Sequence, residues 1–225
     1  MAKKKQTVED QNLENVQEAL NTTSVWIEKN QNKLTWSITI IALVVTGVLA
    51  LNTYVIKPKA VEVSNENAKA VAYFMQGDWE KALNGDDAEC VGFQAIADEY
   101  KMYQGGKLAA LYAGVCYYQL GQYEDAAAYL NKFSANDLTI EPAALQLLGD
   151  AYVQMEDYSK AVKAFEGAAK SGNDLIAPMS LKKAGLVYLE LGDKAAAKKA
   201  FEAIKADYPA SSEAQSIDAY IAIAQ

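Results

Sequence analysis

The chain has 225 residues, of which 51% are hydrophobic and 22% charged, a composition typical of folded globular proteins. It contains no histidine and no arginine, so all 21 basic residues are lysines, and the formal net charge is −8. Without histidine, the chain lacks the usual neutral-pH general base and the commonest metal ligand. Without arginine, it lacks the side chain that binds phosphate through two parallel hydrogen bonds. We expect no catalytic site, no cofactor and no metal. The acidic balance also argues against nucleic-acid binding.

Residues 1–33 form the first predicted segment, which carries five lysines and five acidic residues. Its apolar positions recur every three or four residues, which predicts a short amphipathic helix. It could be an interfacial helix, a coiled-coil stub or a docking helix for a partner. Two of the seven stripe positions are polar, so at most weak self-association is expected. The stripe consists of Leu13, Val16, Leu20, Thr23, Ile27, Asn30 and Leu34.

Residues 34–56 carry no charge and form the second segment. As a helix these 23 residues would span about 35 Å, against about 30 Å of bilayer hydrocarbon. Trp36 and Tyr54 lie near the two ends, where aromatic rings favour the headgroup region. The pattern predicts a transmembrane signal anchor. A buried core helix and a cleaved signal peptide are the alternatives, although 33 preceding residues are many for a signal peptide. Pro58 is expected to kink or end the helix.

The distribution of lysines predicts the orientation of this anchor. Five lysines precede the span, whereas Lys57, Lys59 and Lys69 follow it closely. The positive-inside rule then places the amino terminus in the cytoplasm and residues 57–225, in a bacterium, in the periplasm. The predicted location is the inner membrane, with a single pass. Ala42, Thr46 and Ala50 form a four-residue stripe that would let two helices approach closely, but chance composition explains it equally well.

A repeated spacing of small and aromatic residues dominates residues 57–225. Successive copies are offset by 35 and 36 residues, and a degenerate earlier copy contains an insertion. Each copy pairs a glycine and a tyrosine three residues apart with a later alanine and a Leu or Phe. The clear copies contain Gly114, Tyr117, Ala126 and Leu130; Gly149, Tyr152, Ala161 and Phe165; and Gly185, Tyr188, Ala197 and Phe201. The degenerate copy contains Tyr73, Gly77, Trp79 and Ala82.

This pattern resembles the tetratricopeptide repeat, a 34-residue helix–turn–helix unit. The glycine would let the second helix approach the first, and the tyrosine would fill the seam between them. Pro142 and Pro178 fall where first helices should begin, and Pro209 falls near the end of the last copy. The expected fold is therefore all-α, with about four repeats after the apolar helix. The residues after Pro209 are expected to form a capping helix, which repeat arrays need.

The two cysteines and the acidic insertion offer little chemistry. Residues 84–92 contain Asp86, Asp87 and Glu89, but the alternating ligands of a calcium loop are missing, so a solvated loop is expected. Cys90 and Cys116 lack a CxxC spacing and a histidine partner, which argues against a zinc or redox site. Whether they form a disulfide is left open.

Function is expected on the surface of the first helices, which line the concave face of such arrays. A mixed apolar and polar groove there suits an extended or helical peptide. Some of these side chains could instead be covered by the next repeat or by the cap. The candidate groove residues are Val71, Phe74, Leu111, Val115, Tyr118, Gln146, Asp150, Val153, Lys182, Leu186 and Leu189.

A short cytoplasmic tail, one anchor and a periplasmic repeat array resemble the ancillary subunit of the bacterial Sec translocon. The resemblance implies a non-catalytic scaffold or chaperone-like adaptor that contacts translocon subunits, client polypeptides or periplasmic chaperones. The segment "FEAIKADYPASSEAQSIDAYIA" is also similar to repeat proteins of outer-membrane protein assembly and of cell-division coordination. A scaffold in one of those complexes is the first alternative. A cell-wall accessory enzyme is the second, and the sequence supplies no polar constellation for it.

Overall fold

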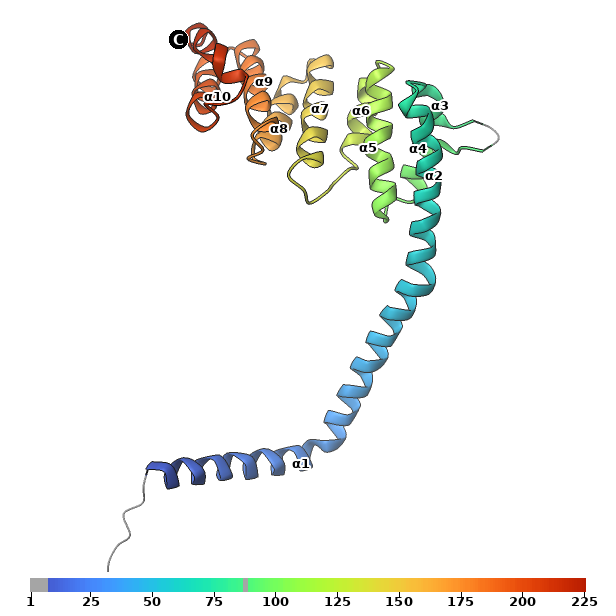
Figure 1. Cartoon of the computed structure of the whole chain (residues 1–225), viewed down its shortest axis with the longest axis vertical. Helices are drawn as coiled ribbons and strands as arrows, with labels where there is room; N and C mark the ends of the chain where they lie inside the picture. The colour runs from blue at the N-terminus through green and yellow to red at the C-terminus, as the bar shows by residue number, and fades with distance from the viewer. Residues whose placement is uncertain (1–7, 87–88) are drawn as a thin grey trace, which may run out of the picture. The chain divides into compact units, whose positions relative to one another are not determined.

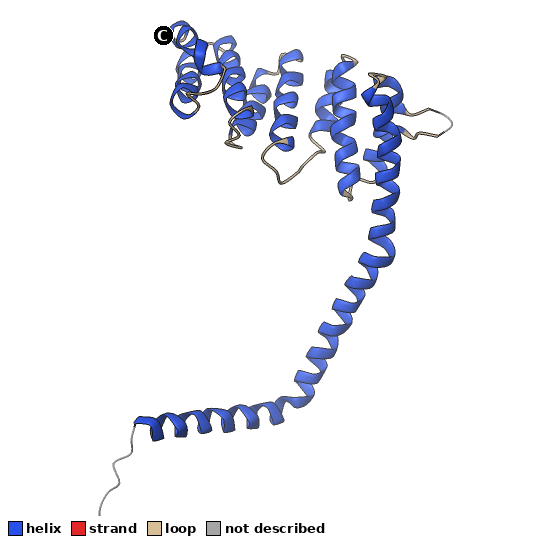
Figure 2. Ribbon diagram, viewed as in Figure 1, coloured by secondary structure: helices blue, strands red, loops and turns tan. Residues whose placement is uncertain are grey.

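The computed structural model describes residues 8–86 and 89–225, and side chains from Asn21 onward. Helices dominate this described part, which contains no β-strand but one isolated bridge between Asp86 and Cys90 (Figure 2). The chain divides into two compact units between Pro58 and Lys59. The all-α prediction is therefore confirmed. The stripe positions Leu13, Val16 and Leu20 precede the described side chains.

The first unit contains helix α1 (Val8–Leu51) and a π-helical turn, η1 (Asn52–Ile56). The helical backbone continues into α2 (Lys57–Met75), which belongs to the second unit from Lys59 onward. The helical stretch Asn21–Met75 contains an uncharged window that is long and apolar enough to cross a membrane, and none of that window is buried. Large apolar side chains such as Trp36 and Leu43 remain exposed in it, at 69% and 68% of their surface. The expected apolar helix is therefore present.

Pro58 neither ends the helix nor interrupts it. The proline nitrogen has no hydrogen to donate to the carbonyl of Tyr54, so the regular α-helical bond is missing there. The backbone widens into η1 immediately before it, and the N–H of Lys57 donates to the carbonyl of Asn52. The extra residue of the π-turn accommodates the hydrogen bond that Pro58 cannot make, and the helix continues. Single π-turns of this kind occur inside α-helices.

The second unit is an array of helical hairpins stacked in chain order (Figure 1). The three clear repeats are the pairs α5 (Gln104–Gln119) and α6 (Tyr123–Leu130), α7 (Ile140–Gln154) and α8 (Tyr158–Ala169), and α9 (Ile176–Glu190) and α10 (Lys194–Asp207). Pro142 and Pro178 lie in the first turns of α7 and α9, where a missing N–H costs nothing. The two prolines therefore lie at the starts of first helices.

The degenerate first repeat pairs α2 with an interrupted second helix. That helix is divided into α3 (Trp79–Asn84) and α4 (Gly92–Glu99) by the predicted insertion. Gly85 and Gly92 close the base of the loop, both with positive φ, and a Cβ on Gly92 would lie 2.4 Å from the nitrogen of Gly85. The carboxylate of Asp86 accepts hydrogen bonds from the N–H groups of Glu89 and Cys90. The insertion thus interrupts the second helix without disrupting the packing of the hairpin. Asp87 lies outside the described residues.

The repeat glycines lie directly against the large residue of the second helix. A Cβ on Gly114 would lie 2.6 Å from Leu130 Cγ, and a Cβ on Gly149 would lie 2.5 Å from the ring of Phe165. Gly185 has the same relation to Phe201, at 2.3 Å. Phe165 and Phe201 are almost completely buried. The recurring glycine and Leu or Phe are therefore the two sides of one close helix crossing.

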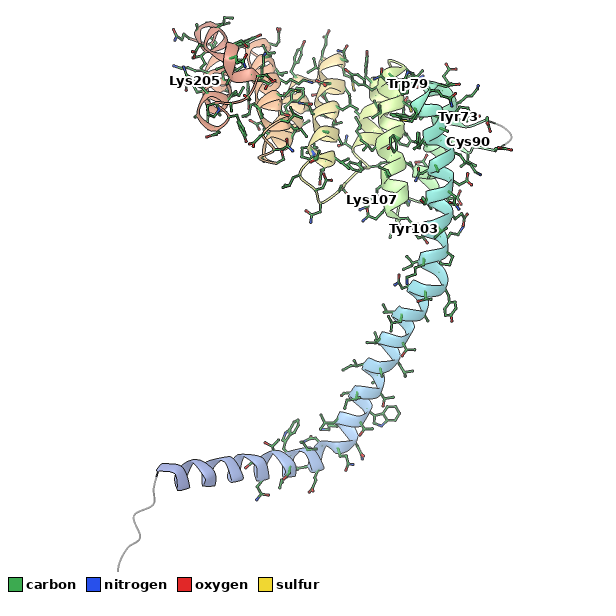
Figure 3. The ribbon with its side chains drawn as sticks, viewed as in Figure 1. Tyr73, Trp79, Cys90, Tyr103, Lys107 and Lys205 are labelled. Carbon is green, nitrogen blue, oxygen red and sulfur yellow. The ribbon has the colours of Figure 1, made fainter. Side chains whose placement is uncertain are left out.

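Because each repeat is a hairpin, its internal turn and its connection to the next repeat lie at opposite edges of the array. Figure 3 shows this in the first repeats, where Trp79 and Tyr103 mark opposite ends of the helices. We define the turn edge as residues 76–78, 120–122, 155–157 and 191–193. We define the inter-repeat edge as residues 100–103, 131–139, 170–175 and 208–212. Helices α5, α7 and α9 begin at the inter-repeat edge, whereas α2 begins at Lys57, six residues before Val63, which lies against Gly105 at the start of α5.

The four turns share one backbone geometry, and one of them lacks glycine. In each, the repeat tyrosine's carbonyl accepts an N–H five residues on, as in the bond from Asp193 N to Tyr188 O at 2.9 Å. The residue before that donor has positive φ, and it is Gly77, Gly121, Glu156 or Gly192. Glu156 therefore holds a left-handed conformation, with φ at 59°, that L-residues adopt at a cost.

Replacing Glu156 by glycine should stabilise the array. The left-handed conformation costs an L-residue about 1–2 kcal/mol, and the extra flexibility of glycine in the unfolded chain offsets roughly 0.5–1 kcal/mol of that gain. We expect a net rise in unfolding free energy, measured by urea denaturation followed by circular dichroism. Gly121→Ala is the matched control and should lower stability, because a Cβ at Gly121 touches nothing but its φ is 74°. A Glu156→Gly variant less stable than the parent would contradict this account.

Aspartate caps three of the four second helices. The carboxylates of Asp78, Asp157 and Asp193 accept the backbone N–H three residues on, whereas Gln122 makes no such bond. The hydrogen bond from the ammonium group of Lys160 holds the pKa of Asp157 below its ordinary value. A carboxyl with a lowered folded-state pKa stabilises the fold above its unfolded pKa, and this contribution is lost as the pH falls through the folded pKa.

The stability difference between the parent chain and Asp157→Asn should therefore depend on pH. Asparagine caps helices about as well as aspartate, so the comparison isolates the charge. The parent should be more stable at pH 7, and the difference should shrink as the pH falls below about 4, near the unfolded pKa of aspartate. Urea unfolding at several pH values measures it. A difference that is constant across this range would show that the charge does not contribute.

The chain after Pro209 forms a short 3₁₀ turn, η2 (Glu213–Ser216), and helix α11 (Ile217–Ile223), as expected of a cap. Ile217 is fully buried and belongs to a cluster with Phe201 and Ile204. The phenyl ring of Phe201 lies 5.5 Å from the ring of Tyr220. This helix therefore covers the apolar face that the last hairpin would otherwise expose.

Candidate interaction surface

The eleven predicted groove residues all lie on the first helices α2, α5, α7 and α9, and none of them is buried. They occupy three equivalent positions in each clear repeat, which recur after 35 and 36 residues, and two of these positions in the first repeat. What the structure adds is the set of neighbours that each residue contacts, and these differ from one helix to the next.

On α2, Phe74 is held in an aromatic cluster. Its ring lies 5.1 Å from Trp79 and 4.9 Å from Tyr112, in edge-to-face arrangements, and 6.1 Å from Phe93. This cluster joins four helices of the first two repeats, so Phe74 stabilises the array. Val71 packs beside the same core cluster. The first repeat therefore contributes packing more than an accessible binding surface.

On α5, Tyr118 packs against the second helix of its own repeat and senses the charge of the next repeat. Its ring lies 5.4 Å from Tyr123 at the start of α6. Burial raises the pKa of the Tyr118 hydroxyl, and the negative charge of Asp150 on α7 raises it further. Tyr118 therefore stays a neutral hydrogen-bonding group near a carboxylate. Leu111 packs against the core cluster, while Val115 stays half-buried between the two.

On α7 and α9, polar side chains bridge neighbouring repeats. Asp150 pairs with Lys183, with Nζ 2.6 Å from Oδ2, and both side chains stay partly exposed. The amide of Gln146 donates to the hydroxyl of Ser180, which is fully buried. Lys182, the lysine among the predicted groove residues, does not make this pair. The ammonium group of Lys182 lies 4.9 Å from the ring of Tyr220 in the cap helix, which leaves Lys183 to approach the carboxylate.

The cap covers one end of the predicted groove. Leu189 packs against the C-terminal cluster, and Val153 packs against the cluster around Phe165. Leu186 remains 39% exposed. The accessible part of the surface is therefore its middle, where Val115 and Leu186 flank the Asp150–Lys183 pair. Such a surface offers apolar contact beside one positive and one negative group, and it presents no nucleophile or general base.

Lys183 and Ser180 are the members of this surface that sequence reasoning missed. Both lie on α9, the helix that also carries Lys182 and Leu186. A pairing signal did exist, because Asp150 and two lysines lie on neighbouring first helices within about one helical turn of each other in the repeat register. The choice between two adjacent lysines depends on the cap, which the repeat pattern does not describe.

A polar cavity of about 620 Å³ lies beside the insertion and is distinct from the groove. Its lining includes Glu62 and Glu66 of α2, Glu99 at the end of α4, Tyr100 after it, and Cys90. The hydroxyl of Tyr100 donates to Glu62 at 2.8 Å. Among the residues that the structure describes, no group of three or more acidic or cysteine side chains is arranged to hold a metal ion.

Both thiols are unpaired and buried. Burial raises the pKa of the Cys116 thiol to about 12 and also raises the pKa of Cys90. Both are therefore protonated and poorly nucleophilic at neutral pH.

Comparisons with known proteins agree with this architecture. Residues 108–137 and 147–212 each match a family model of the tetratricopeptide repeat. The chain is similar in fold to a crystal structure of MamA protein, with 22% identity, a TM-score of 0.54, and coverage of 72% of this chain and 80% of that one.

It is also similar to the Q17M crystal structure of nearly identical TPR-like repeats of a kinesin light chain of Podosopora anserina. There the identity is 15%, the TM-score is 0.54, and coverage is 73% of this chain and 85% of that one. No curated protein matches the chain significantly. These similarities concern the fold. The repeats are of the tetratricopeptide type, which typically serves as a non-catalytic scaffold for protein–protein interaction.

Proposed function

We propose that the chain is a membrane-anchored interaction scaffold whose repeat array binds polypeptides in the periplasm of a bacterium. The observation that carries the proposal is the union, in one chain, of an exposed apolar helix of bilayer length with a tetratricopeptide-type array. The array keeps apolar and charged groups accessible between α5 and α9.

The chemistry of the apolar helix supports the anchor. A bilayer interior offers no water to hydroxyl groups, so a spanning helix must satisfy them itself. Thr39 and Thr46 donate to the carbonyls of Thr35 and Ala42, each at 2.8 Å. Residues 34–56 carry no charge, and five lysines precede them. The amino terminus would accordingly be cytoplasmic.

The partner that we propose is the Sec translocon or the polypeptides that emerge from it. This follows from the arrangement of tail, anchor and array, which resembles the ancillary translocon subunit. Other envelope complexes, such as those of outer-membrane protein assembly or cell division, would use the same arrangement with a different partner. The groove chemistry suits an extended or helical peptide that carries apolar side chains and a charge of either sign.

Membrane attachment is tested by cell fractionation at alkaline pH. The full chain should stay in the membrane pellet, and a variant with lysines at Leu43 and Val48 should move to the soluble fraction, because charges in the span are costly. Protease added to osmotically opened cells should degrade the array while the bilayer stays sealed. A full chain extracted like a soluble protein would refute the anchor.

Partner binding is tested by photo-crosslinking in cells. A crosslinker at Val115 or Leu186 should capture translocon subunits or emerging chains. The matched control is Leu191, which is 47% exposed on the turn edge, away from the groove. Capture of a different envelope complex at Leu186 would replace the proposed partner. Capture of the same proteins at Leu191 and Leu186 would refute the groove.

A further inference from the structure

We propose that the inter-repeat edge of the array lies on the lipid surface, with Met102, Leu138 and Leu175 in the headgroup region of the bilayer. The inference rests on the proposed membrane anchor and goes beyond it, because an anchor alone does not say which edge of the array faces lipid. Three observations carry it: the exposure of these side chains, the way their loops are held, and the length of the tether.

Three successive connections between repeats each present one large apolar side chain to solvent. Met102 is 85% exposed, and Leu138 and Leu175 are each 69% exposed. Each lies one or two residues before the first helix that follows it, namely α5, α7 and α9. Single exposed apolar residues are ordinary on protein surfaces. Recurrence at an equivalent place in three repeats along one edge is a patterned feature.

Hydrogen bonds hold these side chains outward. The N–H of Tyr103 donates to the carbonyl of Tyr100, which closes a turn with Met102 at its corner. The carboxylate of Asp137 accepts the N–H of Thr139 at 2.7 Å and so fixes the backbone around Leu138.

Asn173 plays the same part for Leu175 and also ties two of the loops together. Its side-chain oxygen accepts the N–H groups of Leu175 and Ile176, each at 3.0 Å. Its amide donates to the carbonyl of Leu138 at 3.1 Å. The exposed leucines therefore lie on fixed turns, and folding does not bury them.

The tether length selects a membrane as the occupant of this edge. The apolar span ends at Ile56, and the second unit begins at Lys59, so the connection can reach at most about 10 Å. Lys59 lies in the first turn of α2, and Glu62, one turn further on, accepts a hydrogen bond from the hydroxyl of Tyr100 on the first inter-repeat connection. The Nζ of Lys59 lies 5.5 Å from the ring of Tyr100, on the connection that carries Met102.

Because the headgroup layer is about 5–8 Å thick on each side, the first connection of this edge, which carries Met102, stays close to lipid. The turn edge is about 22 Å away along a first helix of 15 residues. It carries an exposed apolar residue as well, Leu191, but a flat lipid surface that contacts the inter-repeat edge cannot reach it. Leu191 therefore serves as the matched control.

Charge does not favour an anionic surface in particular. The inter-repeat edge contains Lys101, Lys132 and Lys170 against Asp137 and Asp174, a net charge of only +1. Apolar contact should therefore suffice, and zwitterionic lipid should be enough for binding.

The experiment places an environment-sensitive fluorophore on a cysteine at Leu138, in the full chain reconstituted into phosphatidylcholine vesicles. The buried native thiols should react little, and the unsubstituted chain measures that background. The emission at Leu138 should shift to the blue and be quenched by lipids carrying a nitroxide near the headgroup. The same probe at Leu191 should show neither effect, and probes at Met102 and Leu175 should behave like Leu138.

Flotation of the same vesicles separates the two proposals. A chain that floats while the probe at Leu138 stays in water overturns the edge assignment and leaves the anchor standing. A chain that does not float overturns the anchor and, with it, this inference. Equal quenching at Leu138 and Leu191 would overturn the assignment. So would a shift at Leu138 that requires added membrane proteins, because the occupant of the edge would then be a protein.

Discussion

Replacing Gly149 by alanine should lower the free energy of unfolding by about 1–3 kcal/mol, the usual cost of overpacking a core. The added methyl group would lie 2.5 Å from the ring of Phe165, closer than carbon atoms approach without a shift of one of them. Phe165 is 1% exposed and fills the crossing of α7 and α8, so its ring has no space to retreat into. The helices must separate, and the loss of close contact outweighs the better helix propensity of alanine. Urea denaturation followed by circular dichroism measures the change.

Gly167→Ala is the matched control for this prediction. Gly167 lies in α8 of the same hairpin, and a Cβ there would be 3.4 Å from the nearest side-chain atom, which is ordinary contact. The substitution should therefore stabilise the helix by up to about 1 kcal/mol, as alanine does over glycine in a helix interior. Two identical substitutions one helix apart thus have opposite expected signs. If Gly149→Ala proved as harmless as Gly167→Ala, the close crossing would not exist in solution.

The repeat architecture was predictable from sequence because its determinants are local and recur. The same steric requirement, a glycine opposite a Leu or Phe, appears at Gly114, Gly149 and Gly185. The turns were equally predictable, since each contains a glycine or an aspartate. The third turn has Glu156 in place of the glycine, but Asp157 and the spacing of the repeat still located it. Tertiary packing of each hairpin follows directly from these local choices.

The candidate surface was less predictable, because it depends on what covers each first helix. The repeat register correctly assigned all eleven positions to first helices, yet it could not tell packing from accessibility. Phe74 is used in an aromatic cluster created by the irregular first repeat. Lys182 is turned towards the cap by Tyr220. Both differences arise at the ends of the array, where the repeats are least alike and the pattern contains the least information.

The exposed inter-repeat residues show another limit of sequence reasoning. Met102, Leu138 and Leu175 lie in connections, where no periodicity marks them as surface or core. Their exposure follows from the hydrogen-bonded turns made by Tyr103, Asp137 and Asn173. The sequence contains these turn-forming residues, but only the structure shows that they hold an apolar neighbour outward.

The substitution Ile217→Ala in the cap helix should also have a large effect on stability. It should destabilise the C-terminal hairpin by about 2–5 kcal/mol, the range for a buried isoleucine or leucine truncated to alanine. Ile217 is fully buried against Phe201 and Ile204, so the substitution leaves a cavity between α10 and α11. Ile223 lies on the same helix but is 60% exposed. Ile223→Ala should therefore change stability by no more than about 0.5 kcal/mol.

The helices that lose stability show whether the array behaves as a stack in which each hairpin is stabilised chiefly by its neighbours. Each hairpin contacts chiefly the next one, so cap damage should weaken α9 and α10 first and reach α5 and α6 last. Amide hydrogen exchange of the full chain measures this, since protection reports local opening. Ile217→Ala should speed exchange in α10 strongly and in α5 little. Uniform acceleration throughout the array would mean that the hairpins unfold as one cooperative unit and that the cap stabilises all of them.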